Sequence, residues 1–455
     1  MHGWFRGRTL PGGAGHKGGH GAVQGGEAAL TGHSGAPAAT AVIVLGTLDT
    51  KGAECRYLRG AVEALGGRSL LVDVSCLRAA GGQDVDISAE CVAAAAGVPF
   101  AQVAAMPRRE AVEIMGRGAA AVLDQLFRDG RVAAAVALGG ANGSRLAARA
   151  MGSLPVGMPK VLVSVVGATD LTRLVGPRDI TVVNAVCDVS LNPITRPILR
   201  QAAAAVLGMT SVPTEESEAT PSVAMSVLGV TQAAAEACRQ RLEARGEEVA
   251  AFHANGVGGR ALEAAVLDGR IARVVELTPS ELINHLIGGV FSAGEGRMDA
   301  AIARGLPLVV APGAIDFVNF WTGRVPERFA GRRFLQYTDE NLLMRTTAQE
   351  IGAFGALLAA KLNRVYRPAA VAIPTRGFSR FDHPEGPEAQ TLRGEAGGPW
   401  FDPEADAVFG RALETGLRTD LVRVVSVPHH INDPGFAEVM IELLDEVTAR
   451  ALQAG

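Results

Sequence analysis

The stretch Ala41-Val-Ile-Val-Leu45-Gly46-Thr-Leu-Asp-Thr-Lys51-Gly52 decides how this chain is expected to fold. Its apolar run predicts a buried strand, and the small and polar residues that follow predict a turn that opens a helix. In a parallel α/β sheet such a turn lies at the carboxyl edge, where ligands bind. Thr47, Thr50 and Lys51 suit a phosphate, and Asp49 suits a magnesium ion or a ribose hydroxyl. An ordinary strand–helix connection with Thr or Asp as N-cap is the alternative interpretation.

A second turn of this kind follows in Val136-Ala-Leu-Gly139-Gly140-Ala-Asn142-Gly143-Ser144. Its glycines let an anion approach the backbone, and the next helix directs free N–H groups and a positive dipole end toward it. The alternative interpretation is that Ser144 is only a helix cap. The loops after the next two apolar strands belong to the same edge and supply Gly167, Thr169, Asp170, Asn184 and Asp188. Together these turns predict a site for a nucleotide or another phosphorylated ligand.

Composition narrows the class of protein. A chain of 455 residues is too long for one ordinary core and predicts at least two domains. Its apolar residues never form the run of roughly 18 that a membrane span needs. A net charge of −4 and an aromatic content of 5% argue against a nucleic-acid partner. The five cysteines form no CxxC pair, so we expect reduced thiols and a cytoplasmic location.

The pattern of the chain predicts two tandem Rossmann-like domains. Residues 1–39 are rich in glycine and histidine, and we expect a disordered tail there. Apolar strands then alternate with helices through residues 40–210, which predicts a doubly wound α/β domain with a mainly parallel sheet. Residues 211–221 read as a polar linker. The alternation starts again in residues 222–455, which form the second α/β domain.

The second half holds a turn that allows a rival interpretation. Gly256, Gly258 and Ala261 satisfy Gly-x-Gly-x-x-Ala, and Glu276 lies 20 residues past Gly256. This is the spacing of a dinucleotide fingerprint, in which the acid binds the ribose hydroxyls. It predicts an NAD(P)-dependent oxidoreductase. Against that interpretation, the polar side chains beside the turn suit a substrate better than a pyrophosphate.

Polar residues follow several strands of the second half, so we expect a polar rim there. If the chain is an enzyme, its candidate catalytic residues are His253, Arg260, Glu276, Asp316 and His430. Either histidine could act as general base, because imidazole titrates near neutrality. Arg260 would hold a small anionic substrate. Neither His-x-His nor His-Glu-x-x-His occurs, so no metal site is expected in the protein itself.

Several motifs resemble one known family. They are the Gly-Thr-Leu-Asp-Thr-Lys-Gly turn from Gly46, the Gly-Gly-x-x-Gly-Ser turn from Gly139, His253-Ala-Asn-Gly256, Ala311-Pro-Gly-Ala-Ile-Asp316, Pro374-Thr-Arg-Gly-Phe-Ser379 and His430-Ile-Asn-Asp433. The chain resembles, from about Ala41 onward, the ATP-binding domain family typified by the tomato mosaic virus resistance protein. That resemblance implies two Rossmann-like subdomains with ATP, accompanied by magnesium, in the loops of the first. The family usually has Gly-Gly-Ser-Gly-Gly-Thr where Ala141-Asn142-Gly143-Ser144 stands here.

Three classes of function are therefore open. The first is an enzyme that uses ATP to act on a small anionic substrate, and the second is a nicotinamide-dependent dehydrogenase. The third is a non-catalytic module in which ATP steadies a surface for a protein partner. A homo-oligomer is expected in each case, since closed two-fold assemblies are the commonest.

Overall fold

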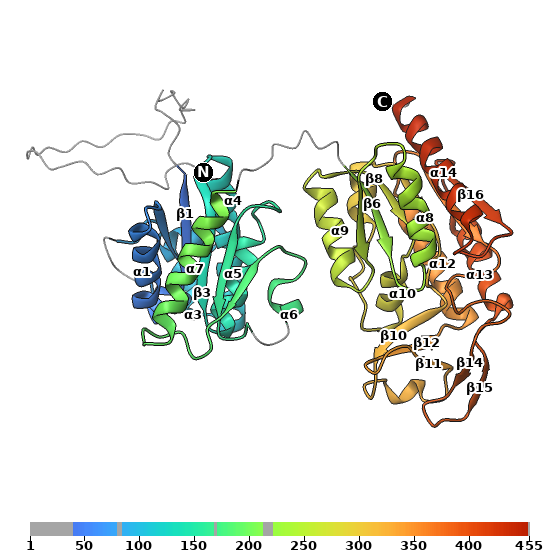
Figure 1. Ribbon diagram of the computed structural model, residues 1–455, viewed down its shortest axis with the longest axis horizontal. Helices are drawn as coiled ribbons and strands as arrows, with labels where there is room; N and C mark the ends of the chain where they lie inside the picture. The colour runs from blue at the N-terminus through green and yellow to red at the C-terminus, as the bar shows by residue number, and fades with distance from the viewer. Residues whose placement is uncertain (1–39, 80–83, 168–170, 213–221, 454–455) are drawn as a thin grey trace, which may run out of the picture. The chain divides into compact units, whose positions relative to one another are not determined.

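The structure is a computed structural model that describes residues 40–79, 84–167, 171–212 and 222–453. The expected tail (1–39) and most of the expected linker (213–221) lie outside these residues. The chain divides into two compact units, residues 1–213 and 214–455, which are described separately below (Figure 1).

The first unit is built on a parallel sheet with the strand order β2-β1-β3-β4-β5. Its strands are β1 (Ala41–Gly46), β2 (Ser69–Asp73), β3 (Val132–Gly139), β4 (Lys160–Ser164) and β5 (Thr181–Asn184). Its helices are α1 (Leu48–Ala64), α2 (Ala89–Ala95), α3 (Phe100–Ala105), α4 (Arg108–Arg128), α5 (Ala141–Met151), α6 (Leu171–Val175) and α7 (Thr195–Thr210).

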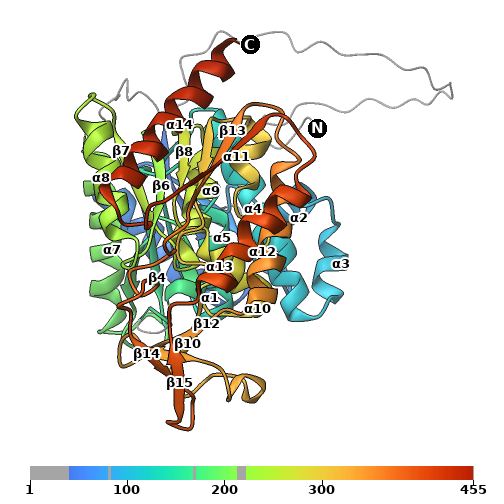
Figure 2. The same cartoon turned by 90° about the vertical axis from the view of Figure 1, so that its right-hand side faces the viewer.

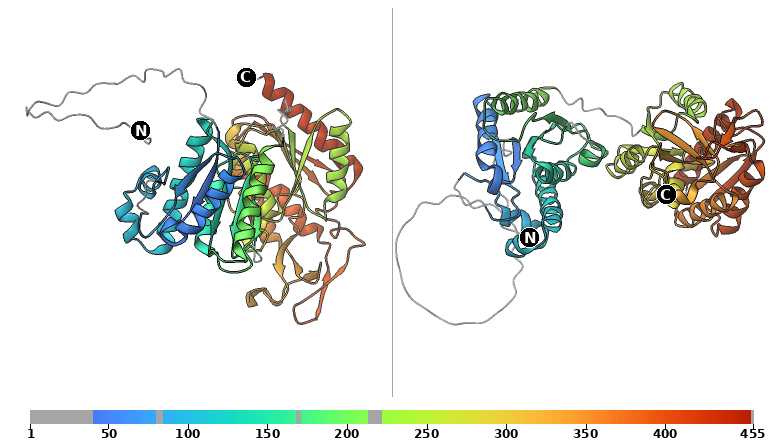
Figure 3. Two further views of the ribbon diagram at one scale, coloured as in Figure 1. Left: turned by 60° about the vertical axis from the view of Figure 1, so that its left-hand side comes forward. Right: turned by 90° about the horizontal axis from the view of Figure 1, so that it is seen from below.

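Strand β1 shows why this sheet forms. All six of its residues are buried, and successive side chains enter opposite cores. Ile43 and Leu45 pack with residues of α4 and α5, whereas Val42 and Val44 pack with residues of α1 and α7. The sheet is thus covered on both faces (Figure 3), as its continuous apolar strands predict.

The second unit contains a larger parallel sheet and a separate antiparallel sheet. The parallel sheet has the order β16-β13-β9-β8-β6-β7. Its strands are β6 (Ser222–Val227), β7 (Val249–His253), β8 (Ile271–Glu276), β9 (Leu308–Val310), β13 (Ala369–Pro374) and β16 (Val422–Val427). The antiparallel strands are β10 (Phe317–Trp321), β11 (Phe334–Gln336), β12 (Asn341–Arg345), β14 (Glu388–Gln390) and β15 (Ala396–Pro399).

Helices cover both faces of this parallel sheet as well. They are α8 (Gln232–Glu243), α9 (Val257–Leu267), α10 (Ser280–Ile287), α11 (Asp299–Arg304), the 3₁₀ turn η1 (Glu327–Phe329), α12 (Ala348–Leu362), α13 (Pro403–Gly416) and α14 (Pro434–Gln453). Residues of α8 and α14 share one core with the sheet, and residues of α9, α12 and α13 share the other (Figure 2). The predicted fold class, two Rossmann-like α/β domains, is confirmed.

The antiparallel sheet is the part of the fold that the sequence does not predict. Its first strand, β10, begins seven residues after β9 ends. The antiparallel sheet therefore starts at the carboxyl edge of the parallel sheet. Its apolar residues Val318, Phe320 and Met344 join the main core of the unit. Part of the edge that was expected to be an open polar rim is therefore covered by protein. Among the described residues, no helix combines the length and apolar character that crossing a membrane requires.

Candidate functional site

A cavity of about 260 Å³ in the first unit brings the two predicted turns together. It is lined by Thr47, Asp49, Thr50, Lys51, Cys76, Arg108, Val112, Gly140, Ala141, Asn142, Gly143 and Leu146. The first turn follows β1 and the second follows β3, and these two strands are neighbours in the sheet. Strand order reverses between them, since β2 lies on one side and β4 and β5 on the other. The cavity thus occupies the topological switch point, where open α/β sheets bind their ligands.

The N-terminus of α5 presents free backbone donors to this cavity. The N–H groups of Ala141, Asn142 and Gly143 have no acceptor among the described residues, whereas the Ser144 N–H bonds to the Gly140 carbonyl at 2.8 Å. Gly140 lines the cavity, and a Cβ on it would meet no atom within 4 Å, so the space beside this glycine is open. Such an arrangement favours an anion through both hydrogen bonding and the helix dipole.

The N-terminus of α1 differs, because the protein supplies its own acceptors there. The Leu48 N–H donates to Asp73 Oδ1 at 3.2 Å, and the Asp49 N–H donates to Ser75 Oγ at 2.9 Å. Both acceptors come from the end of β2 and the residues after it. The first turn therefore contributes side chains to the cavity rather than a free helix terminus.

Lys51 lines the cavity, and its ammonium group bonds to the loop after β5. Its Nζ lies 3.3 Å from the Asp188 carboxylate and 2.5 Å from the Val189 carbonyl, both in the loop after β5. The Lys51 side chain is 18% exposed and that of Asp188 is 75% exposed, so this pair is open to solvent and weak. On the same turn, the Thr47 and Thr50 hydroxyls lie 2.9 Å apart, and Asp49 Oδ2 accepts from the Leu77 N–H at 3.2 Å.

The other predicted residues that the structure describes lie outside the cavity lining. Ser144 is fully buried, and its hydroxyl donates to the Gly139 carbonyl and bonds to Ser164 Oγ. Gly139 is needed for packing, because a Cβ there would lie 2.7 Å from the Gly143 carbonyl carbon. Gly167 packs against Asn184 at the ends of β4 and β5. The predicted residues Thr169 and Asp170 lie outside the described residues.

Four lining residues were not anticipated from the sequence: Cys76, Arg108, Val112 and Leu146. Arg108 and Val112 belong to the first turns of α4, far along the chain from either glycine turn. No local motif marks them, because only the fold brings the start of α4 beside the ends of β1 and β3. Leu146 lies on α5, two residues past the turn that was quoted for this site.

In the second unit, the turn that suggested dinucleotide binding is filled by the protein itself. Glu281 Oε1 accepts from the Gly256 N–H at 2.6 Å and from the Gly259 N–H at 3.0 Å. This carboxylate stands where a pyrophosphate would contact the N-terminus of α9. A Cβ on Gly259 would lie 1.8 Å from Glu281 Oε2, so the glycine makes room for that carboxylate. The geometry argues against an NAD(P) site here.

Glu276 is committed to the same buried ion cluster. It has no exposed surface, and both of its carboxylate oxygens accept from Nη2 of buried Arg297, at 2.8 and 2.6 Å. Arg297 also donates to Glu281 at 2.7 Å and to Glu263 at 2.8 Å. The expectation that Glu276 lies on an open rim or reaches a ribose is therefore corrected, because this carboxylate is enclosed and already paired.

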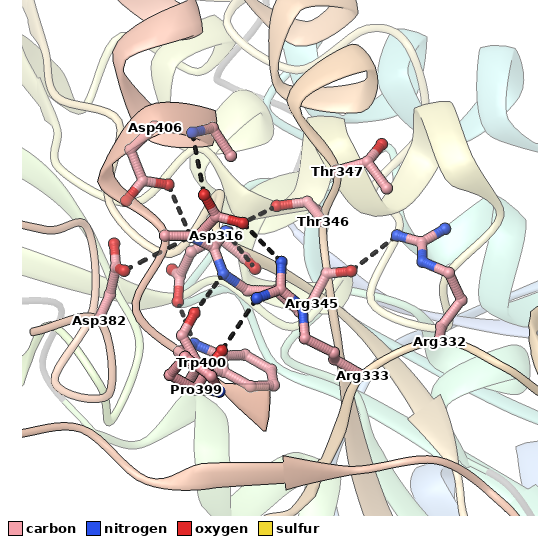
Figure 4. Close-up of polar contacts among 12 residues, drawn as sticks. Asp316, Arg332, Arg333, Arg345, Thr346, Thr347, Asp382, Pro399, Trp400 and Asp406 are labelled. Atoms are coloured by element: carbon pink, nitrogen blue, oxygen red, sulfur yellow. Dashed lines mark hydrogen bonds and ion pairs between the residues drawn. The ribbon is translucent and has the colours of Figure 1, made fainter. Parts of the chain in front are cut away.

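Asp316 belongs to a second buried cluster (Figure 4). Its Oδ2 accepts from Ser379 Oγ at 2.8 Å and from the Trp400 indole N–H at 2.9 Å. Its Oδ1 is buried without a hydrogen-bond partner among the described residues. Burial, reinforced by the charge of Asp382, raises the pKa of Asp316 to about 6. Asp316 therefore lies in the core, not on the open rim that the sequence suggested.

Arg345 of β12 holds this cluster together. Its Nη2 lies 2.7 Å from Asp406 Oδ1 and 3.5 Å from Asp382 Oδ1, and its Nη1 donates to the Asp316 carbonyl at 3.1 Å. Burial raises the pKa of both Asp382 and Asp406. One guanidinium thus faces three enclosed carboxyl groups, which favours keeping a proton on at least one of them. The cluster fixes the antiparallel sheet to the edge of the parallel sheet.

The remaining predicted catalytic residues are dispersed. His253 is exposed at the end of β7, and Arg260 of α9 donates to the Ser292 carbonyl at 3.3 Å. His430 has both ring nitrogens engaged by backbone: Nδ1 accepts from the Asn432 N–H at 3.2 Å, and Nε2 lies 2.9 Å from the Ser379 carbonyl. Because Nδ1 accepts, this arrangement suits the neutral ring with its proton on Nε2. The five residues do not form one open site.

Comparisons with known proteins cover both units. Residues 40–215 match the N-terminal domain and residues 220–448 the C-terminal domain of an uncharacterised protein family, UPF0261. A UPF0261 protein of Rhizobium meliloti is 40% identical over 403 residues, which are 88% of this chain and 97% of that protein. A UPF0261 protein of Clostridium tetani is 34% identical over 406 residues, which are 89% of this chain and 98% of the relative.

A plant protein also matches. The ToMV resistance protein Tm-1(GCR237) of Solanum lycopersicum is 32% identical over 350 residues, which are 75% of this chain and 45% of the tomato protein. This match confirms the resemblance to the tomato protein and its bacterial relatives that the motifs indicated. With both halves matched and bacterial relatives aligned over nearly their whole length, the chain belongs to the UPF0261 family.

Proposed function

We propose that the first unit binds ATP, with its phosphate groups at the N-terminus of α5. The observation that carries this proposal is the row of free N–H groups at Ala141, Asn142 and Gly143, which opens onto a cavity at the switch point of the sheet. Lys51 and Arg108 line the same cavity, so two cations accompany the backbone donors. This combination suits a phosphate chain.

ATP is the specific ligand proposed because of the family resemblance, in which ATP is implied for the loops of the first domain. The turn residues Thr47, Thr50 and Lys51 supply hydroxyl and ammonium groups beside the phosphates. Asp49 is the acidic residue in the lining, and its carboxylate is suited to the magnesium ion that accompanies a nucleoside triphosphate.

Differential scanning calorimetry of the full chain with ATP, ADP, AMP and NAD, each with and without magnesium, tests this proposal. A ligand at a hundred times its dissociation constant stabilises the folded state by about 2.7 kcal/mol. We expect ATP to raise the unfolding temperature of the first unit. Lys51→Ala should weaken that effect, because a hydrogen bond to a charged group contributes roughly 1.5–3 kcal/mol. A shift with NAD and none with ATP would contradict the proposal.

A further inference from the structure

The first unit contains a second cavity beside the proposed nucleotide site. It has a volume of about 590 Å³ and lies between α4, α5 and the segment from α6 to Arg178. Val112 and Leu146 line both this cavity and the smaller one at the sheet edge. The two cavities therefore adjoin across these side chains, and we call the larger one the arginine groove.

Four arginines and a single acidic residue line the arginine groove. Arg117 comes from α4, Arg145 and Arg149 come from successive turns of α5, and Arg178 follows α6. The acidic residue is Glu113, which forms an ion pair with Arg149. No acidic partner is found among the described residues for the other three guanidinium groups. The groove thus carries an excess of positive charge.

Apolar side chains and a large volume are two further properties of the arginine groove. Val112, Leu146, Leu174, Val175 and Pro177 supply apolar contact between the cations. A volume of about 590 Å³ lies within the range of small-molecule sites and exceeds the needs of one inorganic ion. Guanidinium groups bind carboxylate and phosphate oxygens in a bidentate manner and are always charged. These features together suit an organic molecule with several anionic groups and a carbon skeleton.

We propose that the arginine groove binds a small organic polyanion, a polycarboxylate or a sugar phosphate, beside the nucleotide site. Binding of the anion rests on the groove alone. Its role as the substrate on which the nucleotide acts rests on the proposed ATP site. The anionic-substrate site then lies in the first unit rather than at Arg260 in the second unit, where the sequence suggested it.

Isothermal titration calorimetry of the full chain with citrate and with fructose 1,6-bisphosphate, at constant ionic strength, tests the groove. The two probes separate carboxylate from phosphate recognition. We expect at least one to bind with a dissociation constant below about 1 mM. Arg145→Ala and Arg178→Ala should each weaken that binding by roughly tenfold or more, since each removes a charged hydrogen-bond donor. Arg128→Ala is the matched control, because Arg128 pairs with Asp124 outside the groove.

A second set of variants distinguishes anion binding in the groove from ATP binding at the nucleotide site. Gly140→Val fills space beside the α5 N-terminus and should abolish ATP binding while sparing the anion. Arg145→Ala and Arg178→Ala should weaken anion binding and spare ATP. The groove proposal is overturned if neither anion binds the wild-type chain, if Arg128→Ala weakens binding as much as the groove variants, or if the anion simply competes with ATP. Anion binding without ATP binding would keep the groove and remove the proposed nucleotide function.

Discussion

At the scale of single residues, the partners of a polar group decide which chemistry is open to it. Lys51 lies against an exposed carboxylate that a ligand can displace. Asp316 and Glu276, by contrast, are fully buried and hydrogen-bonded within the core. Lys51 and Asp316 follow apolar strands and Glu276 ends one, so their position along the chain does not separate them. What separates these three residues is the exposed fraction of each side chain and its hydrogen-bond partners in the folded chain.

The raised pKa of Asp316 predicts a pH dependence of stability. Its carboxyl holds a proton more tightly in the folded chain, with a pKa near 6, than its ordinary value of 3.8. The stability that this group contributes is therefore complete below about pH 4 and is lost as the pH rises through about 6. A shift of roughly two pKa units corresponds to about 3 kcal/mol at most. Asp316→Asn, which cannot ionise, should remove this loss.

Urea unfolding followed by tryptophan fluorescence at pH 4.5 and 7.5 measures this effect. Trp321 and Trp400 both lie in the second unit, whereas the first unit has no tryptophan among its described residues. Relative to wild type, the Asp316→Asn variant should have a higher unfolding free energy at pH 7.5 than at pH 4.5. The exposed Asp420→Asn serves as the control. An equal pH dependence in wild type and Asp316→Asn would contradict the assigned shift.

At the scale of elements, three strand–turn–helix connections look alike in sequence but differ in what occupies the helix N-terminus. At α1 the acceptors are Asp73 and Ser75. At α9 they are Glu281 and Asn255. The N-terminus of α5 has three donors without an acceptor among the described residues. Free donors at the start of a helix mark the place where an external anion can bind.

The occupied turn at α9 makes a prediction about stability. Gly259→Ala places a methyl group 1.8 Å from Glu281 Oε2 and 2.5 Å from Arg297 Nε, both of them buried. We expect a destabilisation of about 1–3 kcal/mol or more, because the ion cluster must move to admit the methyl group. Urea unfolding followed by tryptophan fluorescence reports on this unit. Gly331→Ala is the matched control, since a Cβ there meets no atom within 4 Å. Equal stability of the two variants would contradict the packing role.

The elements also show what could be predicted from sequence. The parallel strands and long helices were predicted because they are apolar or amphipathic over many residues. The antiparallel sheet was missed because β11 and β14 have three residues each and their pairing spans distant segments. Likewise, the sequence locates the turns that begin at Gly46 and Gly139 and the later turn at Gly256. It does not reveal that Glu281 occupies the turn at Gly256. That carboxylate lies 25 residues from Gly256 and reaches it only through the fold.

At the scale of the whole molecule, each unit has cores of its own. The apolar clusters that contain the β1 and β3 residues draw only on the first unit, and those around β6 and β13 draw only on the second. A domain with its own core can in principle fold alone. The family domains follow the same division, at residues 40–215 and 220–448.

We therefore expect residues 40–212 and residues 222–455 to fold as separate fragments. Circular dichroism with thermal melting should show a cooperative transition for each fragment. The first fragment should retain ATP binding, because every residue that lines the proposed site lies within it. If the first fragment lacks a cooperative transition, or folds without binding an ATP that the full chain binds, the division of labour proposed here is wrong.

The central claim, that ATP binds at the N-terminus of α5, is tested most directly by isothermal titration of the full chain with ATP and magnesium. Wild type should bind, and so should Gly60→Val, in which the same side chain enters open space on α1. Gly140→Val should not bind, while keeping the unfolding temperature of a folded first unit. Binding by Gly140→Val as tight as that of wild type, or no binding by wild type, would contradict the account.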